Sequence, residues 1–220
     1  MQLPFTVEEF LSVFERYNRA IGPAPLFAYG LAAFALALAW RGGRPANRTV
    51  LAVLAAFWAM NGAGYHLTFF RSVNPAATAF GTLFLAQAAL YAAAATRLEP
   101  LRFRVRATPR HALALALAGY AAIAYPILGA ALGHAYPRAP LLGLAPCPTT
   151  IFTFAILLLA EDTVPVALYA IPFLWSLLGA SAASQLGIRE DWGLPVAGLA
   201  GTAVLVVRRR RRPAEARGRA

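Results

Sequence analysis

The sequence predicts an all-α fold, a polytopic bundle of membrane-spanning helices, and three observations carry that prediction. Of its 220 residues, 60% are hydrophobic, and the mean hydropathy is +0.58. Most of its apolar stretches approach the ~20 residues that a helix needs to cross a bilayer. Arginine gathers in every second loop between them. We expect seven transmembrane segments, approximately Pro23–Trp40, Thr49–Phe70, Ala76–Thr96, Ala112–Gly133, Leu141–Ala160, Val164–Ser184 and Gly193–Val207.

The arginines also predict the orientation of the bundle. They are concentrated between the first and second stretches, between the third and fourth, and after the last, where Arg208–Arg212 form a continuous run. Positive residues mark the cytoplasmic side of a membrane protein. The pattern therefore predicts a multipass membrane protein with its N-terminus outside and its C-terminus in the cytoplasm.

The net charge of +11 at first suggests nucleic-acid binding. Because the excess lies in the loops expected at the cytoplasmic face, it is better explained by orientation and contact with anionic lipid headgroups. We therefore expect the lipid bilayer as partner and no nucleic acid, while a membrane protein partner or a homo-oligomer stays open. The single cysteine, Cys147, excludes an intramolecular disulfide.

Residues 1–22 are expected to form an amphipathic helix ahead of the bundle, which occupies 23–207 and is followed by a basic tail at 208–220. Thr6 and Glu9 have the spacing of a capping box, and Gly22–Pro23 would end the helix. Its apolar stripe consists of Val7, Phe10, Leu11, Phe14, Tyr17 and Ile21. Such a helix either lies flat on the outer membrane surface or packs over the ends of the other helices. We expect residues 213–220 to be unstructured.

The fifth stretch, Leu141–Ala160, is irregular because Pro146 and Pro148 interrupt its outer half. Proline is tolerated at a helix start and breaks a helix interior. We expect 141–148 to be non-helical or kinked, a conformation tolerated at membrane depth when it is buried or lines a cavity. If this stretch is re-entrant, six segments cross the membrane.

The predicted topology brings unusual polar side chains together on the outer side. The second and fourth stretches both run outward, and the fifth starts from that side. We therefore expect an outer polar pocket that Asp191 also approaches, with candidate residues Asn61, Tyr65, His66, Asn74, His134, Tyr136, Cys147, Thr149 and Thr150.

Three functions remain open for this pocket. His66, His134 and Cys147 together would suit copper, zinc or haem. The broken fifth helix instead suggests a transporter for a small solute or ion, since half-helix ends often lie at such sites. A non-catalytic accessory or partner-binding protein needs neither feature. The sequence contains no Ser-His-Asp arrangement, phosphate loop or zinc-protease motif.

Three strings are specific enough to suggest a family. They are YH…NPAA at Tyr65–Ala77, GHAYP at Gly133–Pro137 and PCPTTIFTF at Pro146–Phe154. In these strings, and over nearly the whole chain, the sequence resembles an uncharacterised family of bacterial multipass membrane proteins, domain-of-unknown-function family 6064. The resemblance implies an integral membrane protein and supplies no activity, substrate or cofactor.

Overall fold

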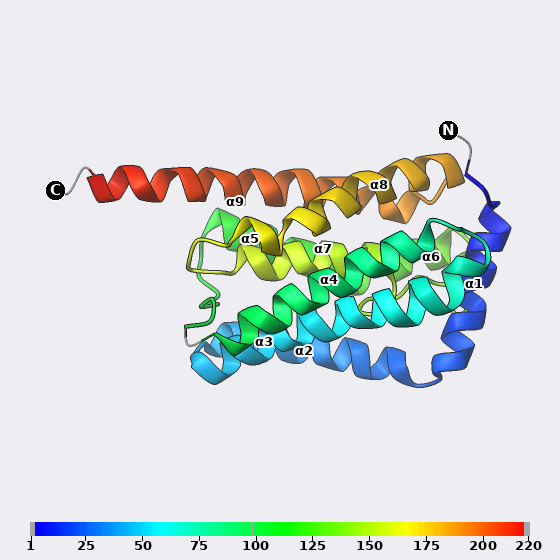
Figure 1. The fold of residues 1–220 in the computed structure, drawn as a ribbon, viewed down its shortest axis with the longest axis horizontal. Helices are drawn as coiled ribbons and strands as arrows, with labels where there is room; N and C mark the ends of the chain where they lie inside the picture. Colours follow the sequence, from blue (N-terminus) through cyan, green and yellow to red (C-terminus); the bar gives the residue numbers. More distant parts are fainter. Residues whose placement is uncertain (1–2, 98, 218–220) are drawn as a thin grey trace.

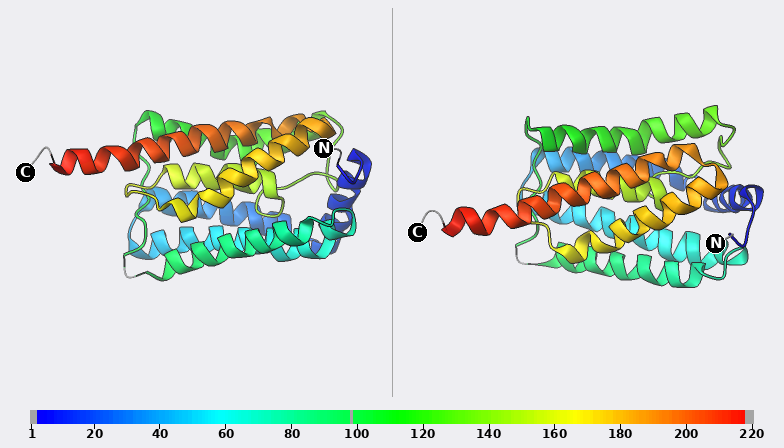
Figure 2. Two further views of the ribbon diagram at one scale, coloured as in Figure 1. Left: turned by 45° about the horizontal axis from the view of Figure 1, so that its top comes forward. Right: turned by 90° about the horizontal axis from the view of Figure 1, so that it is seen from above.

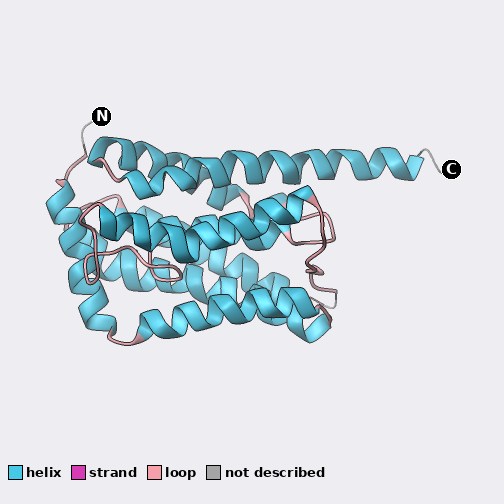
Figure 3. Ribbon diagram, turned by 180° about the vertical axis from the view of Figure 1, so that it is seen from behind, coloured by secondary structure: helices cyan, strands magenta, loops and turns pink. Residues whose placement is uncertain are grey.

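The computed structural model describes residues 3–97 and 99–217, with side chains as far as Arg211 in the last helix. Within these residues the chain is a bundle of roughly parallel helices with one short helix laid across an end (Figures 1 and 2). Its elements are α1 (Val7–Ile21), α2 (Ala24–Arg41), α3 (Arg44–Ala59), η1 (Met60–Phe69), η2 (Phe70–Ser72), α4 (Ala77–Thr96), α5 (Pro109–Gly119), η3 (Tyr120–Ala124), α6 (Tyr125–Ala131), α7 (Pro146–Leu158), η4 (Val166–Leu168), α8 (Ala170–Leu186), η5 (Arg189–Trp192) and α9 (Gly193–Arg217). The all-α prediction is confirmed, since the described chain has no strand (Figure 3).

Six of the described helices are long and apolar enough to cross a membrane. They cover Ala24–Arg41, Arg44–Ser72, Ala77–Thr96, Pro109–Ala131, Val166–Leu186 and Arg189–Arg211. The outer faces of these helices are apolar as well: Leu26 is 78% exposed, Phe27 69% and Ile123 62%. Soluble proteins rarely expose such extended apolar surfaces, so the bundle is compatible with a multipass membrane protein.

The two ends of the bundle differ in charge. The arginine end holds the α2–α3 and α4–α5 loops, where Arg48 donates to the Arg97 carbonyl at 3.2 Å. The arginine run of α9 extends beyond the bundle on the same side (Figure 1). At the opposite end, here called the capped end, α1 lies across the helices (Figure 2). All the loops predicted to be rich in arginine therefore meet at one end.

Helix α7 is a half-helix at the centre of the bundle. Its 13 residues are too few to span a bilayer alone. Asn18 binds the Ala139 carbonyl at the capped end, whereas Glu161 binds the Arg102 carbonyl at the arginine end. The irregular segment 139–145 and α7 thus carry the chain from one end of the bundle to the other.

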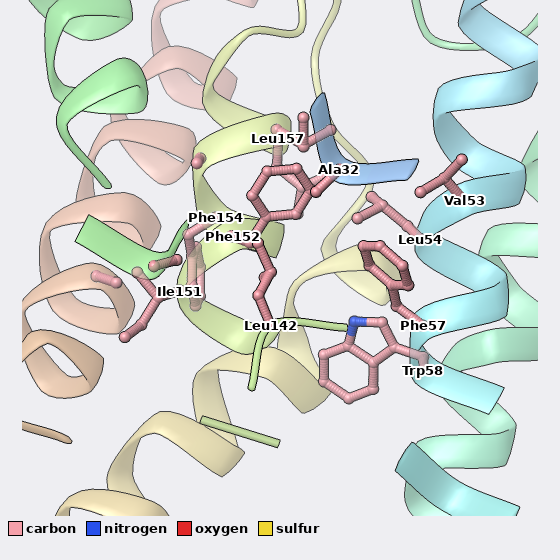
Figure 4. Close-up of a cluster of buried hydrophobic side chains, with 14 of the residues drawn as sticks. Ala32, Val53, Leu54, Phe57, Trp58, Leu142, Ile151, Phe152, Phe154 and Leu157 are labelled. Atoms are coloured by element: carbon pink, nitrogen blue, oxygen red, sulfur yellow. The ribbon is translucent and has the colours of Figure 1, made fainter. Parts of the chain in front are cut away.

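The aromatic and aliphatic side chains of α7 form the core with α3 (Figure 4). Phe152 and Phe154 are fully buried, and the Trp58 indole donates to the Thr153 hydroxyl at 2.9 Å. The non-helical part of the fifth stretch is shorter than expected, because α7 starts at Pro146. A proline in the first turn costs no hydrogen bond, since its missing N–H would have no partner within the helix.

The expectation of an unstructured tail from residue 213 is wrong as far as the chain is described, because α9 continues to Arg217. Residues 218–220 lie outside the described part. Arginine and alanine favour the helix. The helix is also anchored where it leaves the bundle, since Arg208 donates to the Ala160 and Glu161 carbonyls at 2.9 Å.

The contact between α8 and α9 depends on Gly198. A Cβ at this position would lie 1.9 Å from the Ser176 hydroxyl oxygen. We expect Gly198→Ala to destabilise the bundle by about 1–3 kcal/mol through overpacking, lowering the melting temperature measured in detergent. Gly30→Ala is the matched control, because Gly30 has open space around it. Equal melting temperatures for the two variants would contradict this packing.

Candidate functional site: a cavity beneath the N-terminal helix

A cavity of about 320 Å³ lies at the capped end, between α1, η1, α7 and α8. Its walls are mainly apolar, and they include the aromatic side chains of Phe5, Phe10, Phe14, Tyr65, Phe70, Phe80, Tyr125 and Trp175. A few polar groups interrupt these walls, among them His66, Asn74, Cys147 and Asp191. A small apolar cavity with a few convergent polar groups is typical of a small-molecule site.

A π-helical segment, η1, places Tyr65 and His66 at the cavity. It continues α3 over ten residues, and its wider turn aligns positions five apart rather than four. Asn61 and His66 have this spacing, and both are fully buried. π-helical segments often occur at functional sites.

His66 is enclosed by aromatic rings. Its ring centroid lies 4.8 Å from that of Phe84, 5.1 Å from Tyr65 and 5.2 Å from Trp175. Neither ring nitrogen has a hydrogen-bond partner among the described residues, and the buried Tyr65 hydroxyl also lacks one. Buried polar atoms without partners cost free energy, so these groups are suited to bind a hydrogen-bonding ligand.

Asp191, which also lines the cavity, accepts a hydrogen bond from the Tyr125 hydroxyl. The Cys147 thiol at the start of α7 lies near the Asp191 carboxyl group. Asp191 is 4% exposed, and its neighbour Glu190 is fully buried. The His134 Nδ1 lies 2.7 Å from Glu190 Oε1. Two adjacent carboxylates are therefore buried at this end of the bundle, and His134 contacts one of them.

Helix α1 closes the cavity. Phe14 stacks on Tyr65 with ring centroids 4.8 Å apart, and Asn18 Nδ2 donates to the Pro137 and Ala139 carbonyls at 2.7 and 2.8 Å. Of the two placements left open for this helix, the structure therefore has the one over the ends of the other helices. Of its predicted stripe, Leu11, Phe14 and Tyr17 are buried, whereas Val7 is exposed.

The expected capping box of α1 is present. The Thr6 hydroxyl accepts from the Glu9 backbone N–H at 3.2 Å, and the Thr6 backbone N–H donates to Glu9 Oε2 at 2.8 Å. The hydrogen bonds from Thr6 lower the pKa of the Glu9 carboxyl. Because the folded-state pKa is lowered, this stabilisation of α1 is present at neutral pH and is lost as acidification protonates Glu9.

The predicted pocket residues fall into separate places. Tyr65, His66, Asn74 and Cys147 line the cavity. His134 is bound to Glu190, and the described residues contain no group of three or more His, Cys, Asp or Glu side chains arranged to hold a metal. The structure therefore does not bring the proposed ligands His66, His134 and Cys147 together as one set.

The other predicted residues have structural contacts. Asn61 Nδ2 donates to the Phe57 and Gly143 carbonyls at 2.8 and 3.2 Å. The Thr149 hydroxyl accepts from the Gly143 backbone N–H at 3.0 Å. Thr150 donates to the Pro146 carbonyl within its own helix, and Tyr136 is 57% exposed on a loop. Asn61 and Thr149 thus hold the irregular segment before α7.

Three residues around the cavity were missed by sequence reasoning: Tyr125, Trp175 and Glu190. Tyr125 and Trp175 lie inside long apolar stretches, where an aromatic residue carries no distinguishing signal. Glu190 follows Arg189, and the two read as a balanced pair in a loop. Only the arrangement of η5 buries Glu190 beside His134.

The fold and this cavity define a bundle of apolar helices, six of them of membrane-spanning length, that encloses a small site beneath an amphipathic helix. The chain belongs to a family of unknown function, DUF6064, whose model matches residues 7–216. No curated protein and no solved structure matches the chain.

Cys147 reports on closure of the cavity by α1, because it lines the cavity and is the single cysteine of the chain. Asn18→Ala removes two hydrogen bonds from α1, each contributing ~1 kcal/mol. We expect Cys147 of this variant to react with methyl methanethiosulfonate at least ten times faster than Cys147 of the wild type. The reaction is monitored by intact mass spectrometry.

Glu8→Gln is the control for this variant. It removes the contact between the Glu8 carboxylate and Arg138, in which the Glu8 side chain is 74% exposed. Exposed ion pairs contribute little, so the labelling rate should change less than threefold. An Asn18→Ala rate equal to that of the wild type would mean that α1 does not control access.

Proposed function

We propose that this protein is a multipass protein of a bacterial inner membrane that binds a small, mostly apolar molecule with a hydrogen-bonding group. The binding site is the cavity beneath α1. The capped end faces outward, and the arginine end faces the cytoplasm, as the positive-inside rule requires. This orientation gives the ligand access from the outer side or from the outer leaflet.

The observation that carries this proposal is a small set of polar atoms without hydrogen-bond partners in a largely apolar cavity. His66 has two buried ring nitrogens without partners, and Tyr65 has a buried hydroxyl without one, within the described residues. Such atoms favour a ligand that supplies the missing hydrogen bonds. The aromatic walls favour an apolar remainder for the same ligand.

Binding is better supported than passage through the bundle. Below the cavity, every α7 residue from Pro148 to Leu158 is buried. At the arginine end, Arg110 donates to the Leu158 carbonyl at 2.7 Å and Arg208 to the Ala160 carbonyl at 2.9 Å. These contacts close the centre of the bundle on the cytoplasmic side, whereas a transporter needs a path to both sides.

The orientation is tested with fluorescent-protein fusions. Green fluorescent protein becomes fluorescent when it folds in the cytoplasm. We therefore expect a fusion of this reporter to the C-terminus to fluoresce in cells. A fusion to the N-terminus, where the reporter is exported, should stay dark. Neutralising Arg208–Arg212 should weaken the orientation signal and reduce C-terminal fluorescence. Bright N-terminal and dark C-terminal fusions would reverse the proposed topology.

Ligand binding is tested by protection of Cys147 from methyl methanethiosulfonate in lipid nanodiscs. We expect benzyl alcohol to protect the thiol at lower concentration than toluene, because its hydroxyl reaches His66. His66→Phe should remove this difference and retain protection by toluene. Ala182→Phe, which adds a ring to the cavity wall, should abolish protection by both compounds.

Ser184→Phe is the control for the added ring, since Ser184 is exposed and outside the cavity lining. It should leave protection as in the wild type. Organic extracts of the purified wild type and Ala182→Phe should also differ in a co-purifying compound, detected by mass spectrometry. No protection and no difference between the extracts would overturn the proposal.

Metal analysis of the same preparations separates this proposal from a cofactor site. His66 and Cys147 both line the cavity, and imidazole and thiolate suit copper, zinc or haem. We expect metal and haem below one equivalent per chain. A stoichiometric metal or haem lost in His66→Ala would replace ligand binding by a metal-dependent function.

A further inference from the structure

The cavity contains one carboxyl group, that of Asp191, for which the described residues provide no ion-pair partner. Asp191 is one of its lining residues, and no arginine is among them. Within the described residues Asp191 forms no ion pair, and its contacts are with the Tyr125 hydroxyl and the Cys147 thiol. Burying a carboxylate without a counter-charge is costly.

The neighbouring residue Glu190, in contrast to Asp191, contacts a histidine. Glu190 is fully buried, lies outside the cavity lining and has the imidazole of His134 at 2.7 Å. Asp191 lines the cavity and has no such partner among the described residues.

The rest of the cavity is suited to a cation. Trp175 is one of its aromatic walls, and the negative face of an indole ring attracts ammonium groups. The Trp175 ring stands edge-to-face with Phe80, at 5.4 Å between centroids, and with Phe84, at 4.9 Å. This packing fixes the orientation of the indole. A neutral His66 would add a nitrogen acceptor.

We infer that the ligand of this cavity is an organic cation, a small aromatic or aliphatic amine whose ammonium group pairs with Asp191 among the aromatic walls. This inference rests on the proposed ligand-binding function and specifies its chemical class. The amine supplies the counter-charge of Asp191 and donates to the acceptors that lack partners. Its apolar part occupies the aromatic remainder of the cavity.

The test compares two probes of nearly equal shape, benzylamine and benzyl alcohol, at neutral pH. Benzylamine is then cationic and benzyl alcohol neutral. Half-protection concentrations are measured for Cys147 against methyl methanethiosulfonate in nanodiscs of zwitterionic lipid, which avoids accumulation of the cation at an anionic membrane. In the wild type we expect benzylamine to protect at a concentration at least tenfold lower than benzyl alcohol.

Two variants assign the preference to one carboxylate. Asp191→Asn keeps the shape of the side chain and removes its charge, so it should abolish the tenfold preference for benzylamine over benzyl alcohol. Glu190→Gln removes the neighbouring charge outside the cavity lining and should reduce the preference by less than threefold. An equal or larger loss in Glu190→Gln would overturn the assignment to Asp191.

The outcomes separate this inference from the function on which it rests. If benzyl alcohol protects the wild type as well as benzylamine does, or better, the ligand is not a cation. The proposed binding site itself would then still be supported. This comparison needs no variant and therefore does not depend on the folding of Asp191→Asn. Absence of protection by either probe would overturn both proposals.

Discussion

The structure depends on one constraint, which is that the polar backbone ends of a short helix lie inside an apolar bundle. Helix α7 has 13 residues and is therefore about 20 Å long. It leaves free N–H groups at one end and free carbonyls at the other. In a bilayer such groups must find partners within the protein, because the surrounding lipid offers none. The carbonyl end of α7 is accordingly bound by side chains from other helices.

The two ends of α7 are satisfied in different ways. At the arginine end, the guanidinium groups of Arg110 and Arg208 donate to the last carbonyls. Arginine is suited to this role because it presents several donors in a fixed geometry. At the other end, Pro146 and Pro148 have no N–H group, and the Thr149 N–H donates to the Ala145 carbonyl at 3.3 Å. Part of the arginine pattern from which the orientation is predicted therefore also stabilises the centre of the bundle.

Much of the fold could be predicted from the sequence, because apolar length and arginine placement report directly on helices and their direction. The proline pair at Pro146 and Pro148 also identified the half-helix correctly. The site was harder to predict. Topology placed Tyr65, His66, Asn74 and Cys147 at the same end, and they do line one cavity. The sequence also placed His134 in this pocket, whereas in the structure it contacts Glu190. This contact could not be predicted, because Glu190 is distant in sequence and is buried by a short loop helix. The π-helical segment carrying His66 has no signal in the hydropathy pattern.

The cavity follows from the shortness of α7. A full-length helix would fill the central column of the bundle, whereas α7 starts at Pro146 and leaves the capped end to the segment 139–145 and to α1. Aromatic side chains from α1, η1 and α8 surround that space without filling it, since about 320 Å³ remains. The same shortening exposes the start of α7, with Cys147, to Asp191 of η5. A short helix that begins at Pro146 thus leaves both the volume and the polar wall that a ligand requires.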